Sequence, residues 1–220
     1  MKKITVYYVR HGRTLFNELG RMQGRCDAPL TSEGVEQAKI AREELKDIRL
    51  DRAYTSTSER CIDTAHIVLE GRDVPLIYTK KLKEMNWGSY EGVLISANLE
   101  EINRRRYGDA DWSDVGGENR EMLKERILDI YGQIYDESKD NDQILVVSHG
   151  AIFMHMISLV FGLDLDYLRQ QMRMRGENGH PTSHGFAAVF TISDGVFELL
   201  ELRGHTEGLL EEVKRHAGQQ

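Results

Sequence analysis

The chain has 220 residues, of which 40% are hydrophobic and 30% charged, and its formal net charge is −7. This length suffices for one large domain with a substantial core, and an acidic chain without a basic patch is a poor candidate for binding nucleic acid or a membrane surface. Two cysteines, Cys26 and Cys61, are too few for a disulfide framework and lack metal-ligand spacing. We therefore expect a cytoplasmic globular protein in which any anion site draws its positive charge from a few local side chains.

The first half of the chain alternates β-rich apolar runs with amphipathic helices. Residues 4–9 form an apolar run suited to a central strand, and the run ends at Arg10. Residues 30–48 predict a helix because apolar side chains recur there at spacings of three and four, and Thr31 or Ser32 can cap its start. The other elements expected in this half are a strand, a helix and a strand, at residues 52–56, 57–71 and 75–82.

The second half predicts a long helix, a buried strand and a terminal hairpin. Residues 143–150 read "QILVVSHG", which is typical of a strand covered on both faces, and a buried helix is expected at 151–161. The apolar run at residues 151–163, which contains this helix, has 13 residues, whereas a membrane span needs about 20. The other elements expected are a helix and two hairpin strands, at residues 118–137, 186–192 and 197–202.

Strands that alternate with helices indicate an α/β fold. We expect a three-layer α/β/α sandwich whose sheet is mixed but mostly parallel, since the terminal hairpin must add antiparallel strands. Residues 91 to about 118 fit no simple strand–helix step and are interpreted as an inserted, partly helical cap segment. The prediction is therefore a single domain over residues 1–220, with a cap segment at about 91–118.

Cationic and imidazole groups follow three of the predicted strands. Arg10 and His11 end the first strand, His149 ends the strand at 143–150, and Arg60 lies in the first turn of the helix after the strand at 52–56. Ligands of α/β sheets bind at the carboxyl ends of strands, and a helix start that carries an arginine suits an anion. Any one of these side chains alone would more often be structural, but the coincidence of all four predicts a phosphate site.

Phosphoryl transfer is the chemistry that such a group of side chains supports best. A neutral imidazole is a nucleophile toward phosphorus, while arginines and a second, protonated imidazole can neutralise the transferring group. The leaving alkoxide also needs an acid, and Glu84 lies just past the third strand, before a glycine-containing turn. The residues therefore predict an enzyme that cleaves phosphomonoesters.

Five stretches of the chain resemble motifs of the histidine phosphatase superfamily, also called phosphoglycerate mutase-like. "VRHGRTLFN" resembles its signature, Arg-His-Gly-x-Thr-x-x-Asn, and "RMQGRCDAPLTSEGVEQA" resembles the segment that follows. "YTSTSERCIDTA", "GGENREMLKER" and "VVSHG" are similar to later blocks, the last of which carries the second histidine. The resemblance runs in the right order through most of residues 4–150 and is weaker beyond them.

The resemblance implies a role for each matching residue. His11 would be phosphorylated as the covalent intermediate, and Arg10, Arg60 and His149 would bind the transferring phosphoryl group. Glu84 would act as general acid and then as general base on water. The resemblance also places two further residues close to the phosphate, Thr14 and Asn17. It implies a small phosphorylated substrate, no metal and no organic cofactor.

The family contains both phosphatases and mutases, and the residues after Glu84 bear on the choice. Cofactor-dependent mutases of the family usually have Glu-Arg-x-Tyr-Gly after the acid, where the arginine helps to hold an acid group of the substrate. Here Met85 stands in that region, and "GSYEG" resembles the phosphatase branch. We therefore expect hydrolysis, with a phosphoglycerate mutase-type phosphotransferase as the alternative and a non-catalytic phosphate-binding module as a further one.

The cap segment and the remaining histidines leave several points open. One of Arg104, Arg105 and Arg106 is a hypothetical substrate contact, although a solvated helix face is the simpler interpretation. His155 is interpreted as a core residue, and His205 has no assigned role. His180 and His184 lie in a turn-rich stretch that is a poor template for zinc. Substrate selectivity is expected in residues 85–118 and 176–186, and the oligomeric state stays open, a homodimer included.

Overall fold

The computed structural model describes residues 2–108, 110–177, 179 and 183–219. Its centre is one six-stranded sheet with the strand order β3-β2-β4-β1-β5-β6. The strands are β1 (Lys3–Arg10), β2 (Arg52–Ser56), β3 (Leu76–Thr79), β4 (Gln143–Ser148), β5 (Gly185–Ser193) and β6 (Val196–Leu202). The first four strands in this order pair in parallel, and β5 and β6 add two antiparallel pairings. The predicted mixed, mostly parallel sheet is confirmed.

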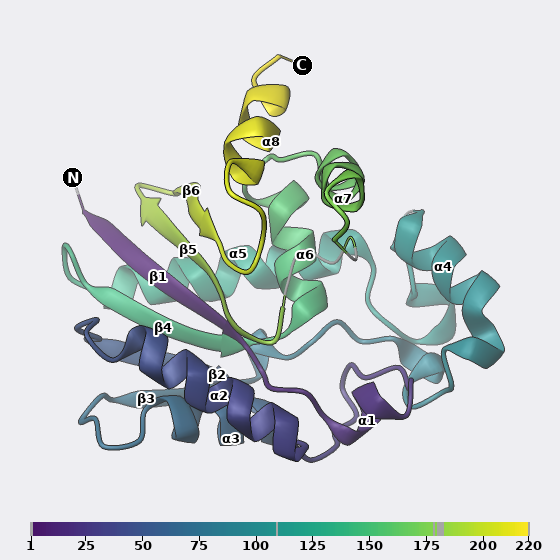
Figure 1. The fold of residues 1–220 in the computed structure, drawn as a ribbon, viewed down its shortest axis with the longest axis horizontal. Helices are drawn as coiled ribbons and strands as arrows, with labels where there is room; N and C mark the ends of the chain where they lie inside the picture. Colours follow the sequence, from purple (N-terminus) through teal and green to yellow (C-terminus); the bar gives the residue numbers. More distant parts are fainter. Residues whose placement is uncertain (1, 109, 178, 180–182, 220) are drawn as a thin grey trace.

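Helices cover both faces of the sheet and complete the three layers (Figure 1). The helices of the two outer layers are α2 (Ser32–Leu45), α3 (Glu59–Val68), α5 (Arg120–Glu137) and α6 (Gly150–Leu159). Alternate side chains of β1 enter different cores, as the pleat requires. Val6 and Tyr8 pack in the larger core with α5 and α6, whereas Val9 packs in the smaller core with α2 and α3. The predicted α/β/α sandwich is therefore confirmed.

The carboxyl ends of three parallel strands meet at one edge of the sheet. Arg10 at the end of β1 pairs with Ser148 at the end of β4, and Thr55 of β2 pairs with Val147. β4 is buried almost throughout because it lies between β2 and β1 with helices on both faces. The residues that directly follow β1, β2 and β4 are therefore brought close together.

The terminal hairpin forms as predicted, with a two-residue turn. Asp194 and Gly195 both have positive φ values, 48° and 80°. Two such residues in succession suit the twist of a tight hairpin, and glycine and aspartate are among those that adopt them most readily. The turn fixes β6 against β5 at the edge of the sheet.

Several elements differ from the sequence expectations. The strand expected at 75–82 ends at Thr79, whose hydroxyl accepts the N–H of Lys81 and starts a short 3₁₀ turn. Residues 91–118 are partly helical, as expected. Their elements are η3 (Ser96–Asn98), α4 (Leu99–Tyr107) and η4 (Ser113–Val115). Three helices that the sequence analysis did not include are α1 (Leu15–Glu18), α7 (Leu165–Met174) and α8 (Leu209–Ala217).

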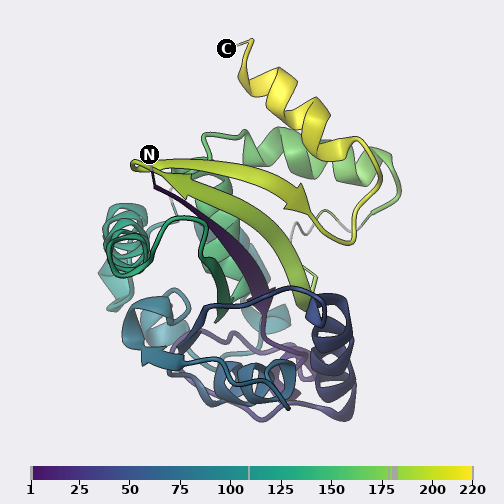
Figure 2. The ribbon, with the colours of Figure 1, turned by 90° about the vertical axis from the view of Figure 1, so that its left-hand side faces the viewer.

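Helices α4, α7 and α8 lie outside the three layers. Figure 2 shows α7 and α8 side by side beyond the β5–β6 hairpin, while α4 stands at the opposite side of Figure 1 from the amino terminus. Within the residues that the structure describes, no helix combines the length and apolar character needed to cross a membrane.

Candidate active site

His11 follows β1 directly and is held by backbone groups on both sides. Its N–H donates to the Ser148 carbonyl at 3.0 Å, and its Nδ1–H donates to the Gly12 carbonyl at 2.8 Å. The second contact fixes the tautomer and leaves the Nε2 lone pair uncommitted. Burial, followed by the charges of Arg60 and Arg10, lowers the pKa of His11 well below its usual value. The imidazole is therefore neutral near pH 7, as a nucleophile must be.

The chain passes so close to α2 at Gly12 that only glycine fits at this position. A Cβ at Gly12 would lie 2.2 Å from the carbonyl oxygen of Gly34, near the start of α2. The Gly12 N–H donates to the Thr64 hydroxyl of α3 at 3.1 Å. The chain after β1 is thus clamped between two helices, which orients the neighbouring imidazole.

His149 follows β4 and faces His11, with ring centroids 5.3 Å apart. Its Nδ1 accepts from an Arg60 Nη at 3.0 Å, and its Nε2–H donates to the Ser56 hydroxyl at 2.9 Å. Burial, and next the charge of Arg60, lowers the pKa of His149 well below its usual value. The expectation of a protonated second imidazole is therefore wrong, because a buried arginine already occupies the neighbouring position.

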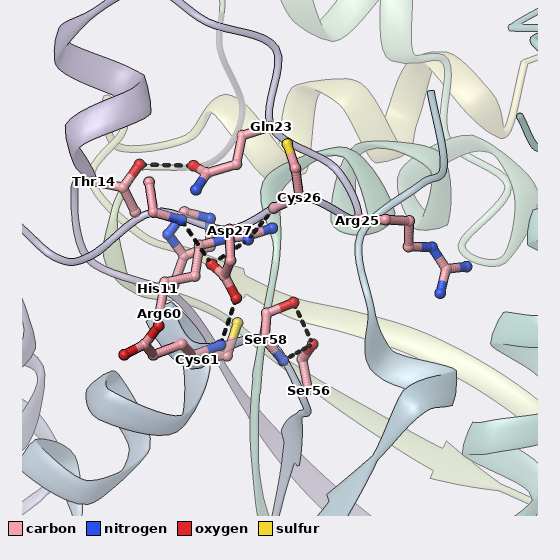
Figure 3. Close-up of polar contacts among 12 residues, drawn as sticks. His11, Thr14, Gln23, Arg25, Cys26, Asp27, Ser56, Ser58, Arg60 and Cys61 are labelled. Atoms are coloured by element: carbon pink, nitrogen blue, oxygen red, sulfur yellow. Dashed lines mark hydrogen bonds and ion pairs between the residues drawn. The ribbon is translucent and has the colours of Figure 1, made fainter. Parts of the chain in front are cut away.

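Arg60 is fully buried at the start of α3 and is surrounded by acceptors from one loop. One Nη donates to the Cys26 carbonyl and to Asp27 Oδ1, at 3.0 and 2.7 Å, and the other donates to the Gly24 carbonyl at 2.9 Å. Its Nε has no acceptor among the described residues. Figure 3 shows Arg60 and Asp27 pointing toward each other while Arg25, in the same loop, points away. The loop therefore immobilises one guanidinium beside the two imidazoles.

Glu84 reaches the site from the loop after η1 (Lys80–Leu82). Its carboxylate accepts backbone N–H groups of Ala151 and Ile152, in the first turn of α6, at 2.9 and 3.0 Å, and that of Met85 at 2.9 Å. A helix amino terminus favours a negative group at this point. The same helix start is preceded by His149, so β4 and α6 bring the carboxylate and the second imidazole to one place.

Arg10, Asn17 and Glu84 line a cavity of about 260 Å³ that opens at this edge of the sheet. Burial lowers the pKa of Arg10 to about 10, so its guanidinium keeps its charge at neutral pH. Thr14 is buried behind the cavity lining, where it caps α1 in a capping box with Asn17. We call Arg10, His11, Arg60, Glu84 and His149 the floor residues, of which Arg10 and Glu84 line the cavity.

Gln23 belongs to the cavity lining and was not among the residues that the sequence analysis selected. Its Oε1 accepts the Thr14 hydroxyl at 2.6 Å, and its Nε2 is buried with no acceptor in the described part of the chain. A buried amide donor without an acceptor beside the floor residues suits an anionic ligand. The only sequence signal was its place in the loop that follows the first histidine motif.

His184 was considered only as a poor zinc ligand, but the structure places it beside His11. The two ring centroids are 5.8 Å apart, and His184 Nε2 lies 3.3 Å from Asn17 Oδ1. The next residue, Gly185, begins β5 and pairs with Arg10. Because β5 is antiparallel to β1, the start of β5 lies at the same edge as the end of β1. His180, from the same stretch, lies outside the described residues.

The three cap arginines point in different directions. Arg104 pairs with Glu101 on the exposed side, and Arg105 pairs with both Glu101 and Asp114. Only Arg106 among them lines the cavity.

Two of the remaining histidines also occupy definite positions. His155 lines the cavity as well, so its interpretation as a core residue is wrong. His205 Nδ1 lies 2.6 Å from Glu177, and His205 is not among the residues that line the cavity.

Comparisons with known proteins agree with this geometry. The profile of the "Histidine phosphatase superfamily (branch 1)" matches residues 6–183. The chain is 31% identical over 176 residues to "Probable phosphoglycerate mutase GpmB" of Escherichia coli (strain K12 / DH10B), which covers 78% of this chain and 81% of that protein. It is 30% identical over 179 residues to "Probable 2-carboxy-D-arabinitol-1-phosphatase" of Arabidopsis thaliana, covering 76% of this chain but 36% of the longer relative.

A solved structure extends the similarity over nearly the whole fold. A phosphoglycerate mutase from Bacillus anthracis str. Sterne superposes with a TM-score of 0.75 at 25% identity, covering 96% of each chain. The family profile begins in β1, before the first histidine, and ends one residue short of His184. The chain therefore belongs to the histidine phosphatase superfamily, branch 1.

Proposed function

We propose that this chain hydrolyses small phosphomonoesters through a phosphohistidine at His11. The observation that carries the proposal is the fixed tautomer of this imidazole: Nδ1–H is bonded to a backbone carbonyl, and Nε2 is left neutral beside two guanidinium groups. The proposal treats residues 1–220 as one catalytic domain with a cap at about 91–118. Its steps use protein side chains and water alone.

In the first step, His11 Nε2 attacks phosphorus and the bond from phosphorus to the ester oxygen breaks. Glu84, in its protonated form, donates its proton to the departing alkoxide, and the products are an alcohol and phosphohistidine. Arg10 and Arg60 bind the oxygens of the transferring group, and Asn17 contributes from the cavity lining. His149 joins them when its Nε2–H moves from the Ser56 hydroxyl to a phosphoryl oxygen. Thr14 acts from behind through Gln23 and Asn17.

In the second step, the Glu84 carboxylate takes a proton from water as the water attacks phosphorus. The phosphorus–nitrogen bond breaks, phosphate leaves, and His11 returns to its neutral form. The carboxyl group is protonated again, which restores the starting state. The same carboxyl group therefore acts as the acid of the first step and as the base of the second, because each step leaves it in the protonation state that the next one needs.

Hydrolysis is favoured over a mutase by the surroundings of Glu84. Met85 is fully buried and is not among the residues that line the cavity, so no cation follows the acid to hold a substrate acid group. The similar proteins include both a probable phosphatase and phosphoglycerate mutases. The branch is therefore part of the proposal, and the alternative is a phosphoglycerate mutase-type phosphotransferase.

The test is a panel of phosphomonoesters that includes 3-phosphoglycerate, with free phosphate and phosphoglycerate isomers both measured. We expect phosphate without isomer, and we expect His11→Ala to reduce release to background because the nucleophile is absent. His66→Ala is the matched control, since His66 is exposed on α3 and contacts Tyr78. The control should retain wild-type turnover.

Three outcomes would contradict the proposal in different ways. Substantial turnover by a folded His11→Ala protein would exclude the phosphohistidine. Isomer formation, above all after addition of bisphosphoglycerate, would show a mutase and make the interpretation of Met85 wrong. Phosphate binding without turnover on any ester would favour the non-catalytic alternative.

A further inference from the structure

Two side-chain amides line the cavity beside the floor residues, those of Asn17 and Gln23. An amide carries an acceptor oxygen at one end and two N–H donors at the other, so its orientation decides whether it binds or repels a phosphoryl oxygen. The neighbours that fix these two orientations therefore bear on how the site binds phosphate.

The Gln23 amide is oriented by the Thr14 hydroxyl. This hydroxyl has one proton and lies 2.6 Å from Gln23 Oε1 but 3.1 Å from Asn17 Oδ1. The shorter contact is the stronger hydrogen bond, so the proton lies on the Gln23 side. Thr14 therefore holds the oxygen end of Gln23, and its hydroxyl proton is not available to Asn17.

The Asn17 amide is oriented by two other donors. The backbone N–H of Thr14 lies 3.1 Å from Oδ1, and because an N–H only donates, the atom that faces it is the amide oxygen. His184 Nε2 lies 3.3 Å from the same oxygen, so this ring nitrogen carries a proton and donates it. The two donors occupy both lone pairs of Oδ1. Asn17 Nδ2 has no acceptor among the residues that the structure describes, and it belongs to a side chain that lines the cavity.

The start of β5 brings His184 to this point. Gly185 pairs with Arg10 in the antiparallel register, so the residue before it lies where β1 ends. Gly185 has a φ of 91°, which favours glycine, and a Cβ there would lie 3.3 Å from a carbonyl oxygen of α2. The ring of His184 consequently lies beside that of His11, with 5.8 Å between centroids and 61° between planes. The sheet thus fixes the position from which His184 contacts α1.

We propose that His184 is a positioning residue for phosphoryl transfer: its Nε2–H holds the oxygen of the Asn17 amide, and this contact points Asn17 Nδ2 toward the transferring phosphoryl group. With His184 in place, the amide turns its oxygen into the cavity only by breaking two hydrogen bonds, whereas without His184 only the bond to Thr14 opposes that rotation. A turned amide would face the phosphoryl oxygens with a lone pair and repel them.

This inference rests on the proposed hydrolysis and adds to it a residue that is 167 positions from Asn17 in the chain. In this role His184 acts through Asn17 and exchanges no proton with the substrate. Its contribution therefore depends on the N–H that it offers to Oδ1, and not on the presence of an imidazole as such.

Replacement of His184 by two amides of different length separates this role from a merely structural one. A glutamine amide reaches about as far as the Nε2 of histidine, whereas an asparagine amide reaches only about as far as Nδ1. His184→Gln should keep kcat/KM within about twofold of the wild type, because an N–H stays within reach of Asn17. His184→Asn and His184→Phe should lower kcat/KM about fivefold, the size expected for one neutral hydrogen bond. Steady-state hydrolysis of p-nitrophenyl phosphate measures all three variants.

A double-mutant cycle tests whether His184 acts through Asn17. Asn17→Ala alone should lower kcat/KM about tenfold or more, since a donor to a charged group is lost. In that background His184→Phe should have no further effect, because the amide that it positions is absent. Thermal unfolding shows which variants are folded, and if Asn17→Ala does not fold, the comparison of His184→Gln with His184→Asn decides alone.

His66→Asn is the matched control for these variants. His66 is exposed on α3 and contacts Tyr78, so its replacement should leave kcat/KM at the wild-type value.

The outcomes separate this inference from the proposed function. Equal losses in His184→Gln and His184→Asn, or additive losses in the cycle, would overturn the positioning role and leave the hydrolase intact. Wild-type rates in every His184 variant, or in Asn17→Ala, would do the same. If the wild-type protein hydrolyses no ester at all, both proposals fail together.

Discussion

The floor residues and the two arginines at the cap end of the cavity, Arg106 and Arg169, are held in different ways. His11, Arg60 and Glu84 are fixed mainly by backbone groups: a carbonyl beside the imidazole, two carbonyls around the guanidinium and three N–H groups on the carboxylate. Arg106 and Arg169 are instead held by side chains: Arg106 contacts the Met22 sulfur, and Arg169 contacts the Met154 sulfur and pairs with Asp166. Backbone contacts do not depend on the identity of the partner side chain, whereas side-chain contacts do. We infer that the floor preserves one reaction while the residues at the cap end of the cavity can vary more readily.

The largest effect is expected at the centre of the floor. Arg60→Ala should reduce kcat by about 10²- to 10³-fold on every substrate, because a preorganised charge next to the phosphoryl group is lost. It should also lower the melting temperature, since Asp27 and the carbonyls of Gly24 and Cys26 lose their buried donor. Steady-state kinetics and thermal unfolding measure the two effects.

Arg13→Ala is the matched control for that prediction. Arg13 is two residues from His11, but it is 38% exposed and pairs with Glu33 on the surface. A surface ion pair contributes about 0–1 kcal/mol, so both turnover and melting temperature should stay close to the wild type. A similar loss of activity in the two variants would mean that general positive charge, and not the bonded position of Arg60, matters.

A smaller and more selective effect is expected from Glu84→Gln. Esters with poor leaving groups should slow by about 10²-fold or more, whereas p-nitrophenyl phosphate, whose leaving group needs little protonation, should change far less. Glutamine can keep its oxygen on the N–H groups of Met85 and Ile152 and lose only the bond to Ala151. Because both rates are measured on the same variant, the ratio of the alkyl rate to the aryl rate does not depend on the fraction of protein that is folded. Equal slowing of both esters would contradict the acid role.

The contrast between the two groups of residues also explains how much of the site can be predicted from the sequence. Arg10, His11 and His149 each follow an apolar strand, and parallel strands bring their carboxyl ends together, so local pattern and one topological rule suffice to place them. The same rule applied to an antiparallel strand would have included His184, which precedes β5. Gln23 could not be found in this way, because a loop residue reaches the site only through the Thr14 hydroxyl.

The sequence could not place Arg106 and Arg169 at the same cavity, for a further reason. Periodicity places Arg104, Arg105 and Arg106 on one helix but does not say which of them faces the cavity, since that depends on how α4 is oriented against the rest of the molecule. Helix α7 was detectable from Leu165, Leu168 and Met172 with a capping Asp164, yet nothing in this pattern brings Arg169 close to the cap. Such long-range packing of an inserted segment is the part that the structure had to supply.

The last and smallest effect concerns His155, which tests whether the cavity is enclosed around this ring. Burial lowers its pKa to about 4, whereas an unfolded chain protonates near the ordinary value of 6.5. Between these values the unfolded state binds more protons, so stability is complete above about pH 6.5 and is lost as the pH falls toward 4. Between pH 7 and pH 5 this one group should cost about 2 kcal/mol of unfolding free energy.

Urea unfolding of the wild type and of His155→Gln at both pH values isolates this contribution from the other titrating groups. The wild type should lose about 2 kcal/mol more than the variant on going from pH 7 to pH 5, because glutamine does not titrate. Equal losses would mean that water reaches the His155 ring and screens its neighbour Arg169. In that case the cavity around His155 would be wet, and its charged side chains would attract an anion far less strongly than those buried among the floor residues.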